Sequence, residues 1–493
     1  MRPFPQRALL LATAATLFLV VPVHAETLRE ALAAAYENNP TLTGARAGQR
    51  ATDEGVQIAR ADGLPSLGAS VGHTEQVIQA SNSFFSPDRI LSVSGQLTVP
   101  IYQGGVVRNA VRAAETRVES GQAELRGTEA SVFSQVVGAY MDVLRDSAVV
   151  ALNRNNVEVL SVNLQATRDR FDIGDLTRTD VAQSEARLAT ARSQLQGVEA
   201  RLIGSRESYI RLVGHVPENL ESPPPLPGLP QAVDAAVETA LADNPDLEAA
   251  QRDADASGFD VRSARGTRMP RVSLTTSGGY SDFLGSVLAP AAPSTTSAST
   301  NVTMTIPLFQ GGRPAARVRQ AQARESQAIE RVIGTERSVI AQTRAAFATW
   351  RAANAVADSS LIAVDANRLS LEGVRAENSV GTRTILDILN AEQELLNAQV
   401  QLVTARRDAY VAGFTLLAAM GRGEAEDIGL NDGAAGGTLY DPDTNYRRVR
   451  GNIWDWDQDP QPQAVSTRTR DTAPQTADVS GKQGPELGLP TQP

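Results

Sequence analysis

Two kinds of hydrophobic pattern occur along the chain, and each occurs twice. Short runs with an apolar residue at every second position predict strands with one apolar and one polar face. The apolar positions of the first pair of runs are Leu67, Ala69 and Val71, then Leu91, Val93, Leu97 and Val99. Those of the second pair are Val272 and Leu274, then Val302, Met304 and Ile306. The polar stretches 81–88 and 290–299 are expected to be connecting loops. Taken alone, the same pattern also fits a soluble protein whose sheet packs one face on a core and exposes the other face to water.

Long segments without proline follow each pair of runs and predict very long helices. Residues 106–171 contain no proline, so at 1.5 Å per residue they predict a helix of about 100 Å. Residues 177–212 predict a returning partner of about 50 Å. Leucines follow a seven-residue spacing typical of coiled coils, at Leu188, Leu195 and Leu202. The alanine-rich residues 28–61, interrupted at Pro40, predict helix before the first strand. Helices this long must pack along other helices in a bundle or tube.

The chain is an internal duplication. Asn39-Pro40 returns as Asn244-Pro245, 205 positions later. The segments that leave the strands match at an offset of 207, as Pro100-Ile101-Tyr102-Gln103-Gly104-Gly105 and Pro307-Leu308-Phe309-Gln310-Gly311-Gly312. This division predicts a signal peptide at 1–25, a first repeat at 26–222, a Pro-rich linker at 223–230, a second repeat at 231–422 and an acidic tail at 423–493.

The N-terminus has the pattern of an export signal. Arg2 and Arg7 form a basic start, and an apolar run of 14 residues follows from position 8 to 21. A membrane-spanning helix needs about 20 such residues, so this run is too short to span. Small residues at Val23 and Ala25 then predict cleavage between Ala25 and Glu26.

Composition removes most kinds of chemistry. The chain has no cysteine, which excludes disulfides, thiolate nucleophiles, cysteine metal sites and a lipid anchor on an N-terminal cysteine. It has three histidines, and one of them lies in the signal segment. A net charge of −10 argues against a nucleic-acid partner. We expect no catalytic residues, no cofactor and no bound metal.

The strands and helices together point to an oligomer in a membrane. Four strands per chain form an open sheet, and its two free edges must close inside lipid. Three chains would supply twelve strands, within the range known for outer-membrane barrels. The tip of the second helical hairpin reads Val380-Gly381-Thr382-Arg383-Thr384-Ile385-Leu386-Asp387-Ile388-Leu389-Asn390-Ala391-Glu392. With these strings, residues 26–422 resemble the TolC family of outer-membrane channel proteins.

The resemblance implies an α+β membrane protein in the cell outer membrane that extends into the periplasm. It implies a homotrimer with one shared 12-stranded barrel and a coiled-coil tunnel. It also implies a periplasmic adaptor and an inner-membrane transporter of the ABC or RND type as partners. The cargo would be drugs and other small molecules or type I secreted proteins, and the sequence does not distinguish these. The absent cysteine fits the branch of the family that is not acylated.

The turns between the long helices carry residues typical of helix ends. The two copies share them at an offset of 207: Gly174, Thr177 and Asp180 in the first, Gly381, Thr384 and Asp387 in the second. The glycines suit the left-handed position that ends a helix. The threonines suit N-caps, and the aspartates stand at the capping-box position three residues later.

The resemblance gives the tips a second role. It implies that Asp387 faces the pore at the periplasmic constriction, where three copies form a carboxylate ring. It also implies that Arg383 holds the tips closed, with Asp180 as a partner. Members of the family can carry a tyrosine where Asn378 stands and an aspartate where Asn390 stands. We therefore expect fewer contacts in the closed state and a weaker cation-binding ring. Helix capping alone is the alternative role for both aspartates.

The tail differs from the repeats. Pro, Gly, Asp and Thr dominate residues 423–493, which predicts a largely disordered segment. The aromatic residues between Tyr446 and Trp456 are the exception and are expected to dock on the outside of the tube. Two other functions compete with an export channel. A periplasmic coiled-coil adaptor without a pore would not explain the duplicated strands, and an exported enzyme lacks a nucleophile with its base.

Overall fold

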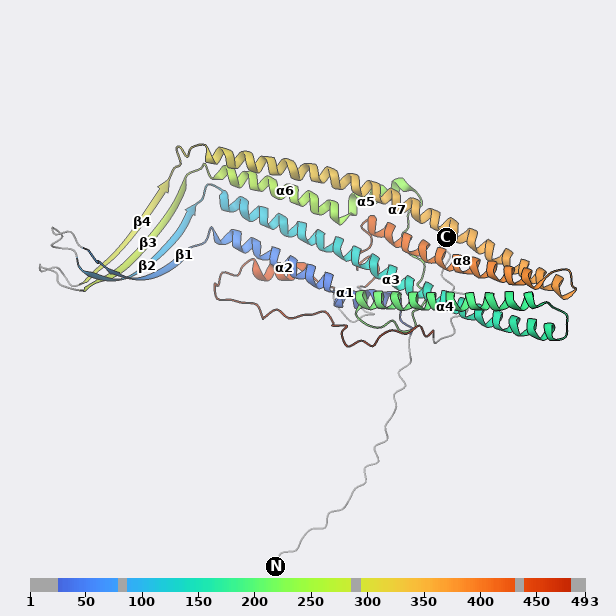
Figure 1. The fold of residues 1–493 in the computed structure, drawn as a ribbon. Coiled ribbons are helices and arrows are strands. Elements are labelled where there is room, and N and C mark those ends of the chain that lie inside the picture. The colour runs from blue at the N-terminus through green and yellow to red at the C-terminus, as the bar shows by residue number, and fades with distance from the viewer. Residues whose placement is uncertain (1–24, 79–86, 285–293, 431–438, 480–493) are drawn as a thin grey trace, which may run out of the picture.

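The computed structural model describes residues 25–78, 87–284, 294–430 and 439–479 and shows an elongated molecule (Figure 1). The strands lie at one end and the turns of the long helical hairpins at the other. The first repeat consists of α1 (Leu28–Asn38), α2 (Pro40–Ala61), β1 (Ser66–Glu75), β2 (Arg89–Tyr102), α3 (Val106–Asp172) and α4 (Arg178–Val213). The second consists of α5 (Val233–Asp243), α6 (Pro245–Gly266), β3 (Arg271–Leu284), β4 (Ser294–Thr305), α7 (Arg313–Ser379) and α8 (Ile385–Ala419). A short helix, α9 (Pro442–Val449), follows in the tail.

The helices match the sequence prediction closely. The long helices α3 and α7 have 67 residues each, and α4 and α8 return alongside them. The predicted break at Pro40 is present because Asn39 ends α1 and caps α2, its side chain accepting from the backbone N–H of Thr41 at 2.9 Å. Within the described ranges, no helix has a stretch both long and apolar enough to span a bilayer.

The four strands form one antiparallel sheet in the order β1-β2-β3-β4. Leu67 lies opposite Leu97 and Val71 opposite Val93, so the alternating apolar residues share one face. On the other face the hydroxyls of Ser70 and Ser94 are 2.8 Å apart. The apolar face is bare in the single chain, with Leu67 80% and Val71 73% exposed. A sheet packed on a soluble core would cover these side chains, so the structure favours contact with lipid. The predicted combination of long paired helices with four strands per chain, in two repeats, is confirmed.

The strands are longer than the pattern indicates, and β3 and β4 extend furthest beyond it. Residues 294–299, expected in a loop, form the first half of β4. Here the strands carry Ser, Thr and Gly on both faces, so no apolar alternation marks them. Cross-strand hydroxyl pairs take its place, with 3.0 Å between Ser277 and Ser299 and 3.3 Å between Thr276 and Thr300. The signal peptide and parts of both loops lie outside the described residues.

The main apolar core lies halfway along the molecule, between α1, α3, α4 and α8. Its largest fully buried side chains include Phe133, Tyr140 and Tyr209. The Tyr140 hydroxyl donates to the carbonyl oxygen of Glu221 at 2.6 Å and lies 2.9 Å from that of Glu26. This hydroxyl therefore ties the segment before α1 and the segment before the linker to α3.

Residues 439–479 of the tail lie along the first repeat, and the disorder that composition predicts for the tail stays a prediction. The helix α9 lies against α2, and the chain then returns as an extended segment along the first repeat (Figure 1). Tyr440 N–H donates to the Tyr36 hydroxyl at 2.9 Å, and the Asn445 side chain donates to buried Asp53 at 2.7 Å. Polar contacts with the helices, rather than a core of its own, position this segment.

Candidate functional site

The two hairpin turns at the end furthest from the sheet are built alike. Gly174 follows α3 with φ +83°, and Gly381 follows α7 with φ +82°. Both lie in the left-handed region, which glycine adopts without the steric cost of a Cβ. The amide of Gly174 donates to Phe171 O at 2.9 Å, and that of Gly381 donates to Asn378 O at 3.0 Å. The glycines therefore end both long helices where the sequence predicts.

A capping box begins each returning helix. Asp180 Oδ2 accepts from Thr177 N at 2.9 Å, and Asp180 N donates to Thr177 Oγ1 at 3.3 Å. Asp387 and Thr384 repeat this arrangement at 3.0 and 3.3 Å. Hydrogen bonds from Thr177 lower the pKa of Asp180, and those from Thr384 lower the pKa of Asp387. Both carboxylates are exposed in the single chain and ionised at neutral pH, so capping leaves their charge available.

Arg383 is bound within its own turn. Its Nε donates to Glu377 Oε2 at 2.7 Å, and its backbone oxygen accepts from Asn378 Nδ2, also at 2.7 Å. Asp180 lies on the other hairpin and bonds to Thr177; among the contacts described within one chain, none joins it to Arg383. Asn378 thus supports the turn from the position where other family members can place a tyrosine.

Two side chains of α8 connect the two hairpins. Asn390 Oδ1 accepts from Arg187 of α4 at 2.6 Å. Glu392, 7% exposed, accepts from Asn163 of α3 at 3.0 Å and from Arg375 of α7 at 3.0 Å. Sequence reasoning missed the part played by Glu392, although a signal was present. It stands four residues after Ile388 and three before Leu395, which places it on the apolar side of the helix.

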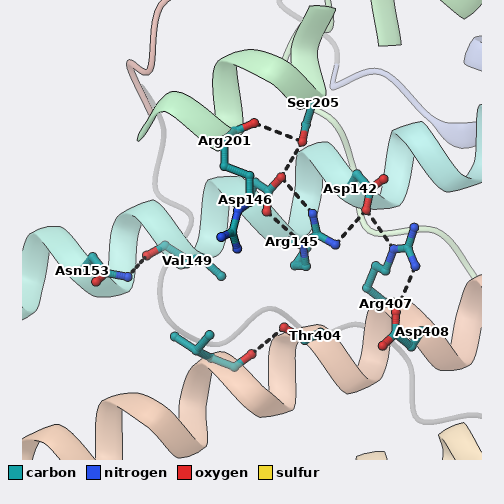
Figure 2. A network of polar contacts seen from close by, with 11 residues as sticks. Asp142, Arg145, Asp146, Val149, Asn153, Arg201, Ser205, Thr404, Arg407 and Asp408 are labelled. Carbon is teal, nitrogen blue, oxygen red and sulfur yellow. Dashed lines mark hydrogen bonds and ion pairs between the residues drawn. The ribbon is translucent and has the colours of Figure 1, made fainter. Parts of the chain in front are cut away.

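A polar network joins the hairpins again nearer the middle of the tunnel (Figure 2). Asp142 of α3 contacts both Arg145 and Arg407 of α8 at 2.9 Å. Asp146, 2% exposed, accepts from Arg145 Nε at 2.8 Å and from the hydroxyl of Ser205 on α4. Because Asp142 and Asp146 lie on α3 while their donors lie on α3, α4 and α8, the network fixes α4 and α8 against α3. Beyond it, Asn390 and Glu392 provide polar contacts between the hairpins, and apolar side chains such as Leu389 of α8 pack against the first hairpin as well.

The residues of the predicted cleavage site lie at the edge of the main core. Ala25 is exposed. The Glu26 side chain accepts from the Tyr209 hydroxyl at 2.5 Å and lies 2.9 Å from His215 Nε2. The hydrogen bond to Glu26 raises the pKa of His215. Glu26 is therefore part of the packed structure, as the first residue of a mature chain can be. Cleavage itself stays a prediction.

Neither turn shows a reaction centre. Within the described part of the chain, no group of three or more acidic or histidine side chains is arranged to hold a metal ion. What the tips present is exposed fixed charge on rigidly capped helix ends.

Known proteins resemble this chain over both repeats. The family described as outer membrane efflux protein matches residues 31–215 and 236–422. Outer membrane efflux protein BepC of Brucella suis is 33% identical over 426 residues, covering 86% of this chain and 91% of that protein. Outer membrane protein TolC of Escherichia coli is 27% identical, covering 82% and 84%. The crystal structure of the outer membrane protein VceC from Vibrio cholerae superposes with a TM-score of 0.68 at 23% identity, over 80% of this chain and 96% of VceC, which shows a shared fold.

Proposed function

The chain belongs to the outer membrane efflux protein family, and we propose that it completes an export machine together with a periplasmic adaptor and an inner-membrane ABC or RND transporter. It lies in the outer membrane, extends into the periplasm and functions as a channel for efflux or type I secretion. The family match supports a pore over the adaptor without a pore. We assign it no catalytic activity.

The proposal that the chain assembles as a trimer rests on the exposed sheet. Its strands β1 and β4 have unpaired edges, and its apolar face is exposed. Unpaired backbone groups are too costly inside lipid for such edges to stay open. Three copies that pair β1 of one with β4 of the next close the edges and form one barrel. The mass of the purified protein in detergent should equal three chains, whereas a stable monomer inserted in a membrane would overturn the shared barrel.

The proposal that the pore is gated at its periplasmic end rests on the residues of the hairpin tips. Asp387 is ionised, exposed and held on a capped helix end, so a threefold arrangement can place three such charges around one axis. Fixed charge in a confined pore raises the local concentration of cations. Arg383, whose bond to Glu377 ties the turn to α7, stabilises the closed tip. Asn390 joins the constriction as the residue that α8 bonds to Arg187.

The duplication supplies a matched control for the gate. Asp180 and Asp387 have the same capping contacts, so changing either to asparagine disturbs a cap equally. In planar bilayers, Asp387→Asn should reduce cation preference and block by divalent ions, whereas Asp180→Asn should leave both unchanged. Unchanged cation preference and unchanged block in both folded variants would assign both aspartates to capping alone, and an equal loss in both would place Asp180 in the pore beside Asp387. Arg383→Ala should raise conductance, and an unchanged conductance would remove Arg383 from the gate.

The partners are tested separately. Affinity capture of the intact trimer from cross-linked cells should copurify one adaptor and one inner-membrane transporter, whose identity names the cargo class. A trimer that conducts in bilayers yet captures neither would contradict the proposed machine and leave the channel itself in place.

A further inference from the structure

The tail runs along α2 toward the end of the molecule that carries the sheet, turns there and runs back. Its contacts follow α2 in order, from Tyr36 just before that helix, through Asp53, to Arg60 in its last turn. Arg60 Nη1 donates to the carbonyl oxygen of Arg450 at 2.6 Å. The chain then turns and runs back, so that Ser466 lies 2.9 Å from Thr43 near the start of α2. Residues 451–457 are therefore the point of the tail nearest the sheet, as the red and brown trace below α2 shows (Figure 1).

This turn, which we call the tail apex (residues 451–457), displays large apolar side chains to solvent. Ile453 is 62% exposed, Trp454 78% and Trp456 92%. The whole chain has three tryptophans, and two of them are here. In contrast, Trp350 packs against an apolar cluster with its ring 5.9 Å from that of Phe347. Solvent alone gives no reason to gather two exposed indole rings at one point.

The apex is a built loop with closed ends. Arg448 donates to both carboxylate oxygens of Asp459, at 2.7 and 3.0 Å. This ion pair joins the segment that enters the apex to the segment that leaves it. Inside the loop, Asn452 Nδ2 donates to Asp457 at 2.6 Å and its Oδ1 accepts from Trp454 N at 3.1 Å. In these bonds, polar groups of the loop pair with one another, while the indole rings remain exposed on the outside of the loop.

The apex lies at the level where the helices meet the sheet. Arg60, which holds Arg450, precedes Ser66 at the start of β1 by only six residues. Two further apolar pairs occupy this junction, one at the end of each repeat's strands: Ile101 and Tyr102, 59% and 50% exposed, and Leu308 and Phe309, 92% and 89% exposed. The apex thus continues a band of apolar and aromatic side chains around the base of the sheet.

We propose that the tail apex inserts Trp454 and Trp456 into the headgroup region of the periplasm-facing leaflet of the outer membrane. Indole rings are favoured at this depth because they combine a large apolar surface with one N–H donor, and girdles of aromatics mark the interfaces of membrane barrels. The proposal rests on the proposed barrel, which sets the membrane at the sheet. It gives the chain a second attachment, besides the barrel, that holds the tail and α2 against the bilayer.

Tryptophan fluorescence tests this directly. In a Trp350→Phe trimer, only Trp454 and Trp456 emit, and phenylalanine keeps an aromatic ring beside Phe347. The trimer is reconstituted into phospholipid vesicles whose acyl chains are brominated near the headgroup, and into the same lipid without bromine. We expect the brominated lipid to quench the larger part of the emission. Bromine near the methyl end of the chains should quench less.

Each other outcome has a defined meaning. Red-shifted emission that bromine does not quench places the rings in water, and blue-shifted emission that bromine does not quench places them against protein; either overturns the proposal. If Trp350→Phe does not trimerise, the difference between the native trimer and a Trp454→Phe/Trp456→Phe trimer gives the same signal. Flotation and conductance of the vesicles are measured first, so a chain that fails to insert contradicts the barrel rather than the apex.

Discussion

Glu424 offers a quantitative test of how the tail joins the repeats. It lies in the turn that follows α8, and its side chain is 15% exposed. Its Oε1 is 3.5 Å from Arg126 Nη1 and accepts no hydrogen bond from the described residues. Neighbouring Glu129, which is half-buried, accepts from Ala425 N at 2.6 Å. Burial raises the pKa of Glu424 from its ordinary 4.5 to about 7.

The raised pKa makes this junction less stable as pH rises. Between the unfolded value of 4.5 and the folded value of about 7, the folded chain binds a proton that the unfolded chain has released. The slope of stability against pH is therefore negative in that window. With those two pKa values, raising the pH from 5.5 to 8 removes about 2 kcal/mol, which corresponds to roughly a thirtyfold increase in opening.

Cysteine labelling measures this opening in the intact trimer. The chain has no cysteine, so Leu430→Cys introduces one thiol at a position that is 5% exposed. The reagent reacts only when the turn opens, and the labelling rate reports the opening equilibrium. The matched protein carries Leu430→Cys with Glu424→Gln. The ratio of the two rates at each pH cancels the ionisation of the thiol.

We expect the rate ratio of glutamate to glutamine proteins to rise by roughly thirtyfold from pH 5.5 to pH 8. Glutamine resembles the protonated acid, so its protein should open no more readily at high pH. A ratio that stays constant would show that Glu424 does not titrate in this window and that its surroundings are more polar than the structure indicates.

Three other contacts give predictions. Asn445→Ala removes a donor from Asp53, which is fully buried, and should weaken tail docking by about 1–3 kcal/mol, measured as faster proteolysis at the tail apex; an unchanged rate would contradict the role of this bond. Glu392→Gln should loosen the hairpin tips and raise single-channel conductance, and an unaltered conductance would mean that apolar packing alone closes them. The pKa of His215 is raised above its ordinary value of 6.5, so the protonated ring stabilises the fold below pH 6.5, and this contribution is lost as the pH rises through the folded pKa. His215→Gln should therefore make the melting temperature vary less with pH over that range. Equal variation in both proteins would mean that solvent screens Glu26.

Local rules predicted most of the backbone because the long helices and their turns obey them in both repeats. An uninterrupted run with no proline from residue 106 gave the length of α3, and the same glycine, threonine and aspartate ended each hairpin. Strand alternation was visible wherever the lipid-facing positions were apolar, as at Leu67 and Val71. It failed at residues 294–299, where Ser, Thr and Ala on both faces conceal the period.

Contacts between distant segments were beyond the reach of pattern. Composition predicts a tail without a core of its own, but it does not reveal that Asp53 and Arg60 of α2 provide partners for Asn445 and Arg450. The bond of Arg383 to Glu377 was equally hidden, since a resemblance supplies roles for residues but not the partner that each one takes within the chain.

The duplication explains why the linker and the tail differ so much in composition. Gly413 of α8 corresponds to Arg206 of α4 at the offset of 207. A Cβ at Gly413 would come within 3.0 Å of the linker's Leu226, so this position must stay small for an apolar segment to cover α8. At Arg206 the guanidinium instead donates to the carbonyl oxygens of Thr476 and Asp478 in the tail.

Each repeat is thus followed by a segment that covers the returning helix of the other repeat. The linker after the first repeat lies on α8, and the tail after the second lies on α4. The contact of Leu226 with α8 depends on an apolar side chain facing a glycine, whereas main-chain carbonyls that accept from arginine place little demand on their own side chains. The apolar linker and the polar tail therefore both hold the two repeats together. They do so through different contacts, which is why their sequences differ.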